Sequence, residues 1–253
     1  MAGEPLHFYP AGGGAWHAIG GIPVDASRNV VAGVVVERSG TLDTLRVALA
    51  VPPLPRPKTE PLKVDTGFTA PPDSALQARI ARENARAREV GQAAHDAPPM
   101  WSAVFFRPRD TRITSPFGSG RVFNGAVTSR HLGVDFAGKT GEPVRAANRG
   151  VVALVDSFFL AGNVIYIDHG GGVVTGYFHL SKQLVAVGDT VARGQEIGLV
   201  GATGRVTASH LHWTARYGAI TVNPLDLVRL GVGWYGGSQR RGTGGGTAAT
   251  SKP

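Results

Sequence analysis

Between residue 100 and about residue 232 the chain consists of short apolar runs separated by glycine-rich turns, and no long helix is expected there. Val144 to Val155 and Asn163 to Ile167 are apolar enough for inner strands. Val185 to Ile197 alternates, with Gly188-Asp189 as a turn. The pattern predicts a mainly β domain, a glycine-rich antiparallel sheet crossed by a groove. The whole chain of 253 residues contains 36 glycines, which suits such a turn-rich fold.

Three of these short runs carry histidines on one side. Successive side chains of a strand point to opposite faces, so His210 and His212 share one face of the run Ser209-His210-Leu211-His212-Trp213. Leu211 and Trp213 then face a core. Two further runs follow the same rule: His131-Leu132-Gly133-Val134-Asp135-Phe136 with His131 and Asp135 together, and Tyr177-Phe178-His179-Leu180 with Tyr177 and His179 together.

The polar faces of these runs have an unusual composition. A lone His-x-His is weak evidence, because two histidines on an exposed strand are ordinary. A solvent-facing side of a sheet usually carries Lys, Glu, Thr and Ser, whereas these faces carry four histidines and an aspartate. That composition suits a Zn²⁺ site with three protein ligands and an open fourth position. The chain has no cysteine, which excludes a thiolate metal site and a disulfide framework.

His131-x-x-x-Asp135 together with His210-x-His212 resembles the lysostaphin/LytM-type zinc metallopeptidases, peptidase family M23. The resemblance runs from about Trp101 to about Leu227. One departure is Ala208-Ser209, where many relatives have Gly-Pro before the His-x-His; it alters a turn but no ligand. Three flanking motifs agree with the family: Ile113-Thr114-Ser115-Pro116-Phe117-Gly118, Gly194-Gln195-Glu196-Ile197-Gly198 and Gly201-Ala202-Thr203-Gly204.

The resemblance implies a role for each of these histidines. Carried over residue by residue, the zinc ligands are His131, Asp135 and His212. The two non-ligand active-site histidines of the family correspond to His179 and His210.

Other residues of the predicted groove are assigned from their position. No His-Glu-x-x-His occurs, so the general-base glutamate of the common zincins is absent and His179 and His210 are its best substitutes. Which of the two acts as base and which stabilises the oxyanion stays open. Tyr177 is expected to contact substrate, since it shares a predicted face with His179. His169 has no expected metal role, because the tetrahedral site is already filled.

The chain divides into four predicted parts. Residues 1–68 form a small β domain, with a β-branched run and strict alternation from Leu45 to Val51, and the family resemblance makes it β-sandwich-like. Residues 69–98 form a helical connector, with a helix over 73–90 that begins at a Ser74-x-x-Gln77 capping box. Residues 99–232 form the catalytic domain, and the Gly/Ser/Thr/Arg-rich residues 233–253 form a disordered tail. No residue before Pro98 is expected to contribute a titratable group to the site.

The net charge of +8 and the pI near 10.3 indicate an anionic partner. No Lys/Arg-rich helix interleaved with aromatic residues is present, so nucleic acid is not expected, and anionic cell-wall polymers fit the charge. No apolar run is long enough for a membrane helix. The start Met1-Ala2-Gly3-Glu4 is not a signal peptide, so the protein is either cytosolic or begins after a removed signal. The resemblance favours the second, an exported, periplasmic or envelope protein; the oligomeric state is open.

Three functions are compatible with these residues. The first is a zinc metalloendopeptidase that hydrolyses cross-links or stem peptides of bacterial peptidoglycan. The second is a non-catalytic wall-binding protein that activates a cell-wall amidase. All five site residues are intact, which favours the enzyme. The third, a cytosolic zinc-storage or structural site, explains the ligands but not the two additional histidines.

Overall fold

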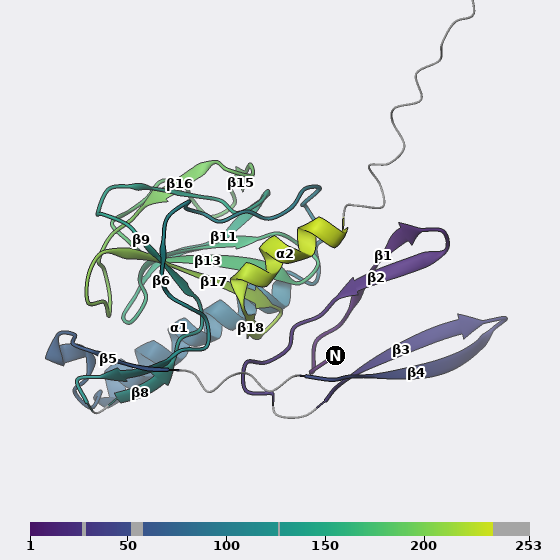
Figure 1. The fold of residues 1–253 in the computed structure, drawn as a ribbon, viewed down its shortest axis with the longest axis horizontal. Coiled ribbons are helices and arrows are strands. Elements are labelled where there is room, and N and C mark those ends of the chain that lie inside the picture. Colours follow the sequence, from purple (N-terminus) through teal and green to yellow (C-terminus); the bar gives the residue numbers. More distant parts are fainter. Residues whose placement is uncertain (27–28, 52–57, 126, 235–253) are drawn as a thin grey trace, which may run out of the picture.

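The computed structural model describes residues 1–26, 29–51, 58–125 and 127–234, and its centre is one antiparallel sheet (Figure 1). The sheet strands are β6 (Ile113–Ser115), β9 (Val134–Ala137), β11 (Gly150–Phe158), β12 (Gly162–Asp168), β13 (Val173–Leu180), β15 (Thr190–Val191), β17 (His210–Tyr217) and β18 (Ile220–Val222). Their order is β15-β11-β12-β13-β17-β9-β6, with β18 paired to β17. The predicted mainly β, antiparallel fold is confirmed.

The apolar faces of the central strands form the main core. Leu211 and Trp213 of β17 are fully buried, as their alternation with the histidines predicts, and they share a cluster with Val134 and Phe136 of β9. In β12 the consecutive residues 164–167 are all buried. A strand buried on both of its faces needs a layer on each side.

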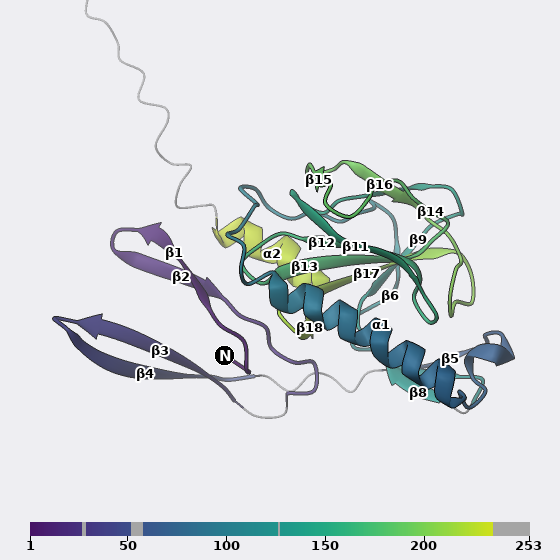
Figure 2. The same ribbon diagram turned by 180° about the vertical axis from the view of Figure 1, so that it is seen from behind.

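Two helices pack against the sheet and lie on its opposite faces (Figures 1 and 2). They are α1 (Ser74–Ala93) and α2 (Pro224–Trp234). The predicted first helix is confirmed, but its cap is Asp73 rather than Ser74, because the Asp73 carboxylate accepts a hydrogen bond from the Leu76 amide at 2.8 Å. α2 was not predicted. Neither helix is long and apolar enough to cross a membrane.

Small residues let α1 lie close to the sheet. Ala87 and Ala94 are buried against Leu154 and Val174. A Cβ on Gly91 would lie 1.9 Å from the Gly218 carbonyl oxygen, so no side chain fits there. The connector predicted from the sequence is therefore part of the same packed body as the sheet.

The N-terminal segment forms two separate hairpins that extend away from the sheet (Figures 1 and 2). They are β1 (His7–Gly12) with β2 (Ala15–Ile19), and β3 (Val30–Arg38) with β4 (Thr41–Leu49). The alternating strand from Leu45 is confirmed within β4, yet every residue of β4 is exposed. A β-sandwich-like domain is not confirmed.

A later strand of the N-terminal segment joins the C-terminal half. β5 (Thr59–Leu62) pairs in parallel with β7 (Gly120–Phe123), which pairs with β8 (Val127–Arg130). This sheet contains strands from both sides of the predicted domain boundary at residue 68. The division into domains otherwise stays a prediction. The remaining elements are a short 3₁₀ helix, η1 (Thr66–Phe68), and a sheet of β10 (Pro143–Arg145), β16 (Glu196–Leu199) and β14 (Lys182–Gln183). The predicted tail lies, from residue 235 on, outside the described residues.

Candidate metal centre

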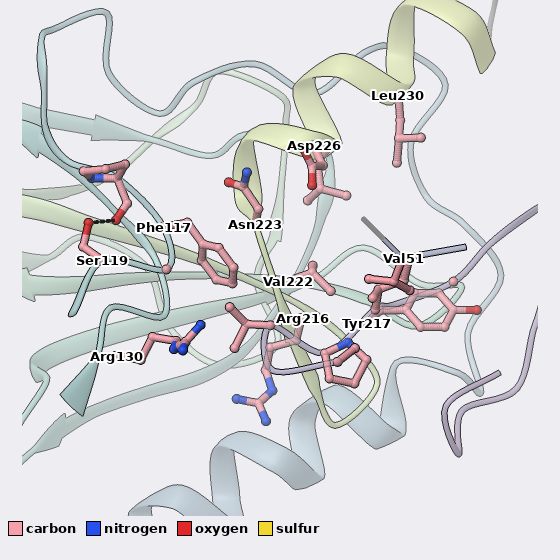
Figure 3. Close-up of a pocket in the computed structure, with 18 of the residues that line it drawn as sticks. Val51, Phe117, Ser119, Arg130, Arg216, Tyr217, Val222, Asn223, Asp226 and Leu230 are labelled. Carbon is pink, nitrogen blue, oxygen red and sulfur yellow. Dashed lines mark hydrogen bonds between the residues drawn. The ribbon is translucent and has the colours of Figure 1, made fainter. Parts of the chain in front are cut away.

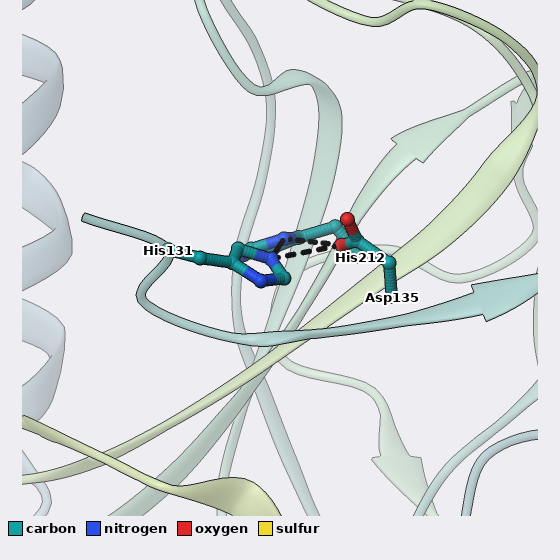
Figure 4. Close-up of side chains that lie close together, drawn as sticks. All are labelled: His131, Asp135 and His212. Carbon is teal, nitrogen blue, oxygen red and sulfur yellow. Dashed lines mark hydrogen bonds and ion pairs between the residues drawn. The ribbon is translucent and has the colours of Figure 1, made fainter. Parts of the chain in front are cut away.

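The register between β9 and β17 creates a cluster of possible metal ligands. His212 lies directly opposite Asp135 across the two strands, with its Nδ1 atom 2.8 Å from Asp135 Oδ1. His131 precedes β9, and its Nε2 atom lies 3.0 Å from Asp135 Oδ1 and 3.0 Å from His212 Nδ1. The three side chains point toward one another (Figure 4). One atom from each residue therefore faces a common point.

The donor set of this cluster fits a zinc ion. His131 Nδ1 lies 2.9 Å from the Pro116 carbonyl oxygen, which can only accept, so Nδ1 carries the proton. His131 Nε2 then presents a lone pair toward the Asp135 carboxylate, which is also an acceptor. Facing acceptors are unfavourable unless a cation lies between them. Two neutral imidazoles and one carboxylate are the common protein ligands of Zn²⁺ at an open site.

The electrostatics of the cluster favour that ligand state. Burial opposes ionisation of Asp135, but the imidazoles of His131 and His212 outweigh it and hold the pKa of this carboxyl well below its usual range. Burial also lowers the pKa of His212 to about 4, against the opposing effect of Asp135. At neutral pH the cluster therefore holds an ionised carboxylate and a neutral His212, the states in which both groups bind metals.

Two contacts hold the His212 ring in place. The Phe178 ring stacks on it, with centroids 5.1 Å apart and planes 18° apart. In the loop before β9, a Cβ at Gly133 would lie only 2.5 Å from His212 Nε2. The glycine between His131 and Asp135 is thus required for the close approach of the loop to the histidine.

His179 lies beside the cluster in a strained backbone conformation. Its φ of 62° is in the left-handed region, which non-glycine residues rarely adopt. Its Nδ1 lies 2.8 Å from the Thr203 carbonyl oxygen and carries the proton, which leaves a lone pair on Nε2. Burial, followed by the neighbouring His210 and His212, holds its pKa well below the ordinary value.

His210 is the second histidine beside the cluster. Its ring centroid lies 4.9 Å from that of His179. Its Nδ1 lies 2.8 Å from the Ala208 carbonyl oxygen, so Nδ1 again carries the proton. Its Nε2 is buried, lies 3.7 Å from Asp135 Oδ1 and has no hydrogen-bond partner among the described residues. A buried nitrogen of this kind is available to a water or a substrate in the groove.

The structure corrects two side-chain directions. Tyr177 was predicted on the face of His179, but it is fully buried in the core, and its hydroxyl contacts Thr175 and accepts from the Ala147 amide. The positive φ of His179 breaks the alternation between the two residues. Leu132, predicted to face the core, is 42% exposed because His131 to Gly133 form a loop and not a strand. Fully buried His169 contacts the Arg149 carbonyl and the Thr175 hydroxyl.

Three groups that support the ligands were not predicted. Arg121 of β7 pairs with Asp135 through the second carboxylate oxygen. Ser115, 3.2 Å from His131 Nδ1, donates to the Glu60 carboxylate at 3.1 Å. Glu60 lies in β5, so the segment before Pro98 does supply a titratable group near the site. Only the pairing of β5 with β7 could have indicated that Glu60 lies near the site, and that pairing joins segments far apart in the chain.

These groups line a groove of about 350 Å³ beside the cluster. We call it the site groove; its charged and imidazole side chains are Glu60, Arg112, Arg121, Asp135, Arg205 and His210. A larger cavity of about 950 Å³ lies between the N-terminal segment, β17 and α2 (Figure 3). Its lining is largely apolar, with Phe117, Val222 and Leu230, and it contains none of the predicted site residues.

Sequence comparison assigns the segment around the cluster to a family. Residues 129–224 match the family model described as Peptidase family M23. Peptidoglycan DD-endopeptidase ShyA of Vibrio cholerae is 48% identical over 105 residues, which are 40% of this chain and 24% of that protein. DD-carboxypeptidase/endopeptidase Mpg of Neisseria meningitidis is 44% identical over 119 residues, 47% of this chain and 27% of that protein. The chain thus spans about a quarter of the length of these curated relatives.

A solved structure is similar over more of the chain. The crystal structure of a proposed M23 peptidase from Pseudomonas aeruginosa superposes with a TM-score of 0.69 at 27% identity. The similarity covers 89% of this chain and 85% of that one. It therefore extends beyond the matched segment into the N-terminal half.

Proposed function

Since residues 129–224 form a domain of peptidase family M23, whose members are zinc-dependent, we propose that the chain is a zinc metalloendopeptidase that hydrolyses peptide bonds in bacterial peptidoglycan. The observation that supports it most is the convergence of His131 Nε2, Asp135 Oδ1 and His212 Nδ1 beside two further histidines. Two relatives, a peptidoglycan DD-endopeptidase and a DD-carboxypeptidase/endopeptidase, support the substrate class.

In this proposal each residue of the centre has a role. His131, Asp135 and His212 hold Zn²⁺, which when bound polarises a carbonyl and lowers the pKa of a bound water. Arg121 occupies the second Asp135 oxygen and so leaves Oδ1 for the metal.

His179 and His210 act on protons. Each has Nδ1 fixed on a backbone carbonyl, which leaves Nε2 as the acceptor. The lowered pKa of His179 keeps it neutral near pH 7, so it can accept a proton from the attacking water. The histidine that stabilises charge on the carbonyl oxygen must donate instead, which requires a second proton on its Nε2 atom. Both share one tautomer, so substitution must assign the two roles.

The test is digestion of purified sacculi, followed by identification of the released fragments by mass spectrometry. We expect His212→Ala to lose zinc and activity. His179→Ala and His210→Ala should retain zinc and lose turnover by roughly 10²-fold or more, the usual scale for a general acid–base group. Zinc content is measured on each variant.

Two results would contradict the proposal. One is zinc-loaded wild-type protein that releases no peptide fragments but stimulates a cell-wall amidase, which would support the non-catalytic alternative. The other is full activity in both histidine variants, which would make those residues structural.

The substrate also determines where the protein would act. We propose that it is exported and works in the periplasm or at the cell envelope, where peptidoglycan lies. Its formal charge of +8 suits an anionic polymer. Fractionation of cells that produce the full-length protein, with detection by antibody, tests this location.

A further inference from the structure

The site groove has a surplus of positive charge. Three guanidinium groups line it, from Arg112, Arg121 and Arg205, against the carboxylates of Glu60 and Asp135. Asp135 is paired with Arg121, so these two charges offset each other. Arg112 is exposed at the surface, whereas Arg205 is half-buried. A bound divalent metal would make the groove more positive still.

Arg205 is the unusual member of this set. Its guanidinium carbon lies 4.0 Å from the centre of the Phe123 ring, a cation–π contact. Within the described part of the chain, no carboxylate forms an ion pair with it and its guanidinium makes no hydrogen bond. Burial and the positive charge of Arg121 lower its pKa. A half-buried guanidinium without an anionic partner is costly, and a negative group bound in the groove would remove that cost.

The loop that carries Arg205 is held tightly. Gly204 has a φ of 76°, and a Cβ there would lie 2.4 Å from the Gly162 amide nitrogen. The Thr203 hydroxyl accepts from the Asn163 amide at 2.9 Å and donates to the Leu180 carbonyl at 3.0 Å. The Thr203 carbonyl is also the acceptor for His179 Nδ1. Arg205 is thus held two residues from the group that orients His179.

We propose that Arg205 binds a free carboxylate of the peptide substrate and so makes the enzyme selective for anionic peptides. This inference rests on the proposed peptidase function and adds to it the chemistry of the recognised group. The planar guanidinium can donate two parallel hydrogen bonds to a carboxylate. Its stacking on Phe123 limits the orientations of the guanidinium, so little freedom is lost when a carboxylate binds.

The experiment compares two synthetic cross-linked stem peptides, one with its carboxylates free and one with them amidated. For wild-type protein we expect a lower KM for the free peptide. Arg205→Gln should raise that KM about 10- to 100-fold, the range for a charge-assisted hydrogen bond, and leave the KM of the amidated peptide unchanged. Arg82→Gln, which removes the same charge from an exposed position on α1, is the matched control.

Equilibrium binding of both peptides to zinc-loaded His179→Ala protein, with and without Arg205→Gln, separates this inference from the proposed function. If the wild-type protein cleaves neither peptide but binding still depends on the carboxylates and is lost in Arg205→Gln, the peptidase function is contradicted and the carboxylate site of Arg205 is supported. If Arg205→Gln weakens the binding of both peptides equally, Arg205 only supports Phe123. If it weakens the binding of neither peptide, Arg205 does not contact the substrate carboxylate. Either result overturns the proposal. If Arg205→Gln does not fold, Arg205→Lys replaces it; this variant keeps the charge but loses the two parallel donors, so it should raise the KM of the free peptide by a smaller factor and leave the amidated peptide unchanged.

Discussion

The β3–β4 hairpin and the β13–β17 pair are both antiparallel strand pairs with alternating apolar residues, but their environments are opposite. All nine residues of β4 are exposed, whereas seven of the eight residues of β13 are buried. Leu42 in the hairpin is 70% exposed and Leu211 in β17 is fully buried. Alternation therefore identifies a strand, but only the neighbouring layers determine whether its apolar side becomes a core.

The same contrast applies to polar residues. Asp135 acts in a buried cluster of convergent side chains, while Asp43 lies on the exposed hairpin. Chemistry needs the burial and the fixed geometry that the main sheet supplies. Within the described residues, the hairpins supply neither burial nor a fixed geometry for a polar side chain. Matched substitutions in the hairpin and in the main sheet can therefore test whether the two regions differ in what they contribute to activity and stability.

The largest expected effect is at the metal centre. Asp135→Asn removes the only anionic ligand, so we expect loss of stoichiometric zinc and a fall in activity beyond the about 10- to 100-fold typical of groups that only support a ligand. Asp43→Asn makes the same change on the hairpin and should leave both unchanged. Elemental analysis and the sacculus assay measure the two outcomes. Zinc retained at wild-type stoichiometry in Asp135→Asn would remove this residue from the ligand set.

A smaller effect is expected on stability. Leu211→Ala should lower the free energy of unfolding by about 2–5 kcal/mol, because it opens a cavity in the main core. Leu42→Ala deletes the same atoms from an exposed strand and should cost less than about 0.5 kcal/mol. Urea denaturation of both variants gives the comparison. A large cost for Leu42→Ala would show that the hairpin packs against a partner in solution.

The smallest effect is a pH dependence of stability. Burial lowers the pKa of His169 to about 4, so the folded protein keeps it neutral while the unfolded chain binds a proton below pH 6.5. Stability from this residue is complete above pH 6.5 and is lost as the pH falls toward 4, by about 2 kcal/mol at pH 5. His169→Gln should flatten the pH profile of unfolding. His17→Gln, in exposed β2, is the matched control, and equal slopes for wild type and His169→Gln would contradict the assignment.

The sequence predicted best where the backbone is regular. In β17 the alternation of His210 to Trp213 is reproduced in full, with the apolar pair buried. The prediction was wrong for Tyr177 because His179 has a positive φ, and no local pattern signals such a conformation at a non-glycine residue. It was also wrong for Leu132, since a strand was assumed where Gly133 lets the loop approach His212.

Some features depend on segments that are distant in the chain. Glu60 has no local signal, because its place in the groove comes from the pairing of β5 with β7. α2 did have a signal: Asn223 before Pro224 is a typical helix start, and the Asn223 side chain accepts from the Leu225 amide. It was missed because the glycine-rich composition favoured strands throughout. The exposure of the hairpins was not predicted either, because their apolar residues suggested a core.

The parallel pairing of β5 with β7 also bears on how the protein folds. Asp135 and His212 lie on strands that pair antiparallel although they are far apart in the chain, and His131 lies in the loop before β9. Glu60 reaches the groove only after a parallel crossover of nearly sixty residues, which contains α1, has closed. Closing so long a loop is entropically costly and slow, so such a contact tends to form late in folding. The contact of His212 with Asp135 spans 77 residues and that of Ser115 with Glu60 spans 55, so the ligand cluster and the wall of the groove that carries Glu60 both depend on long-range contacts.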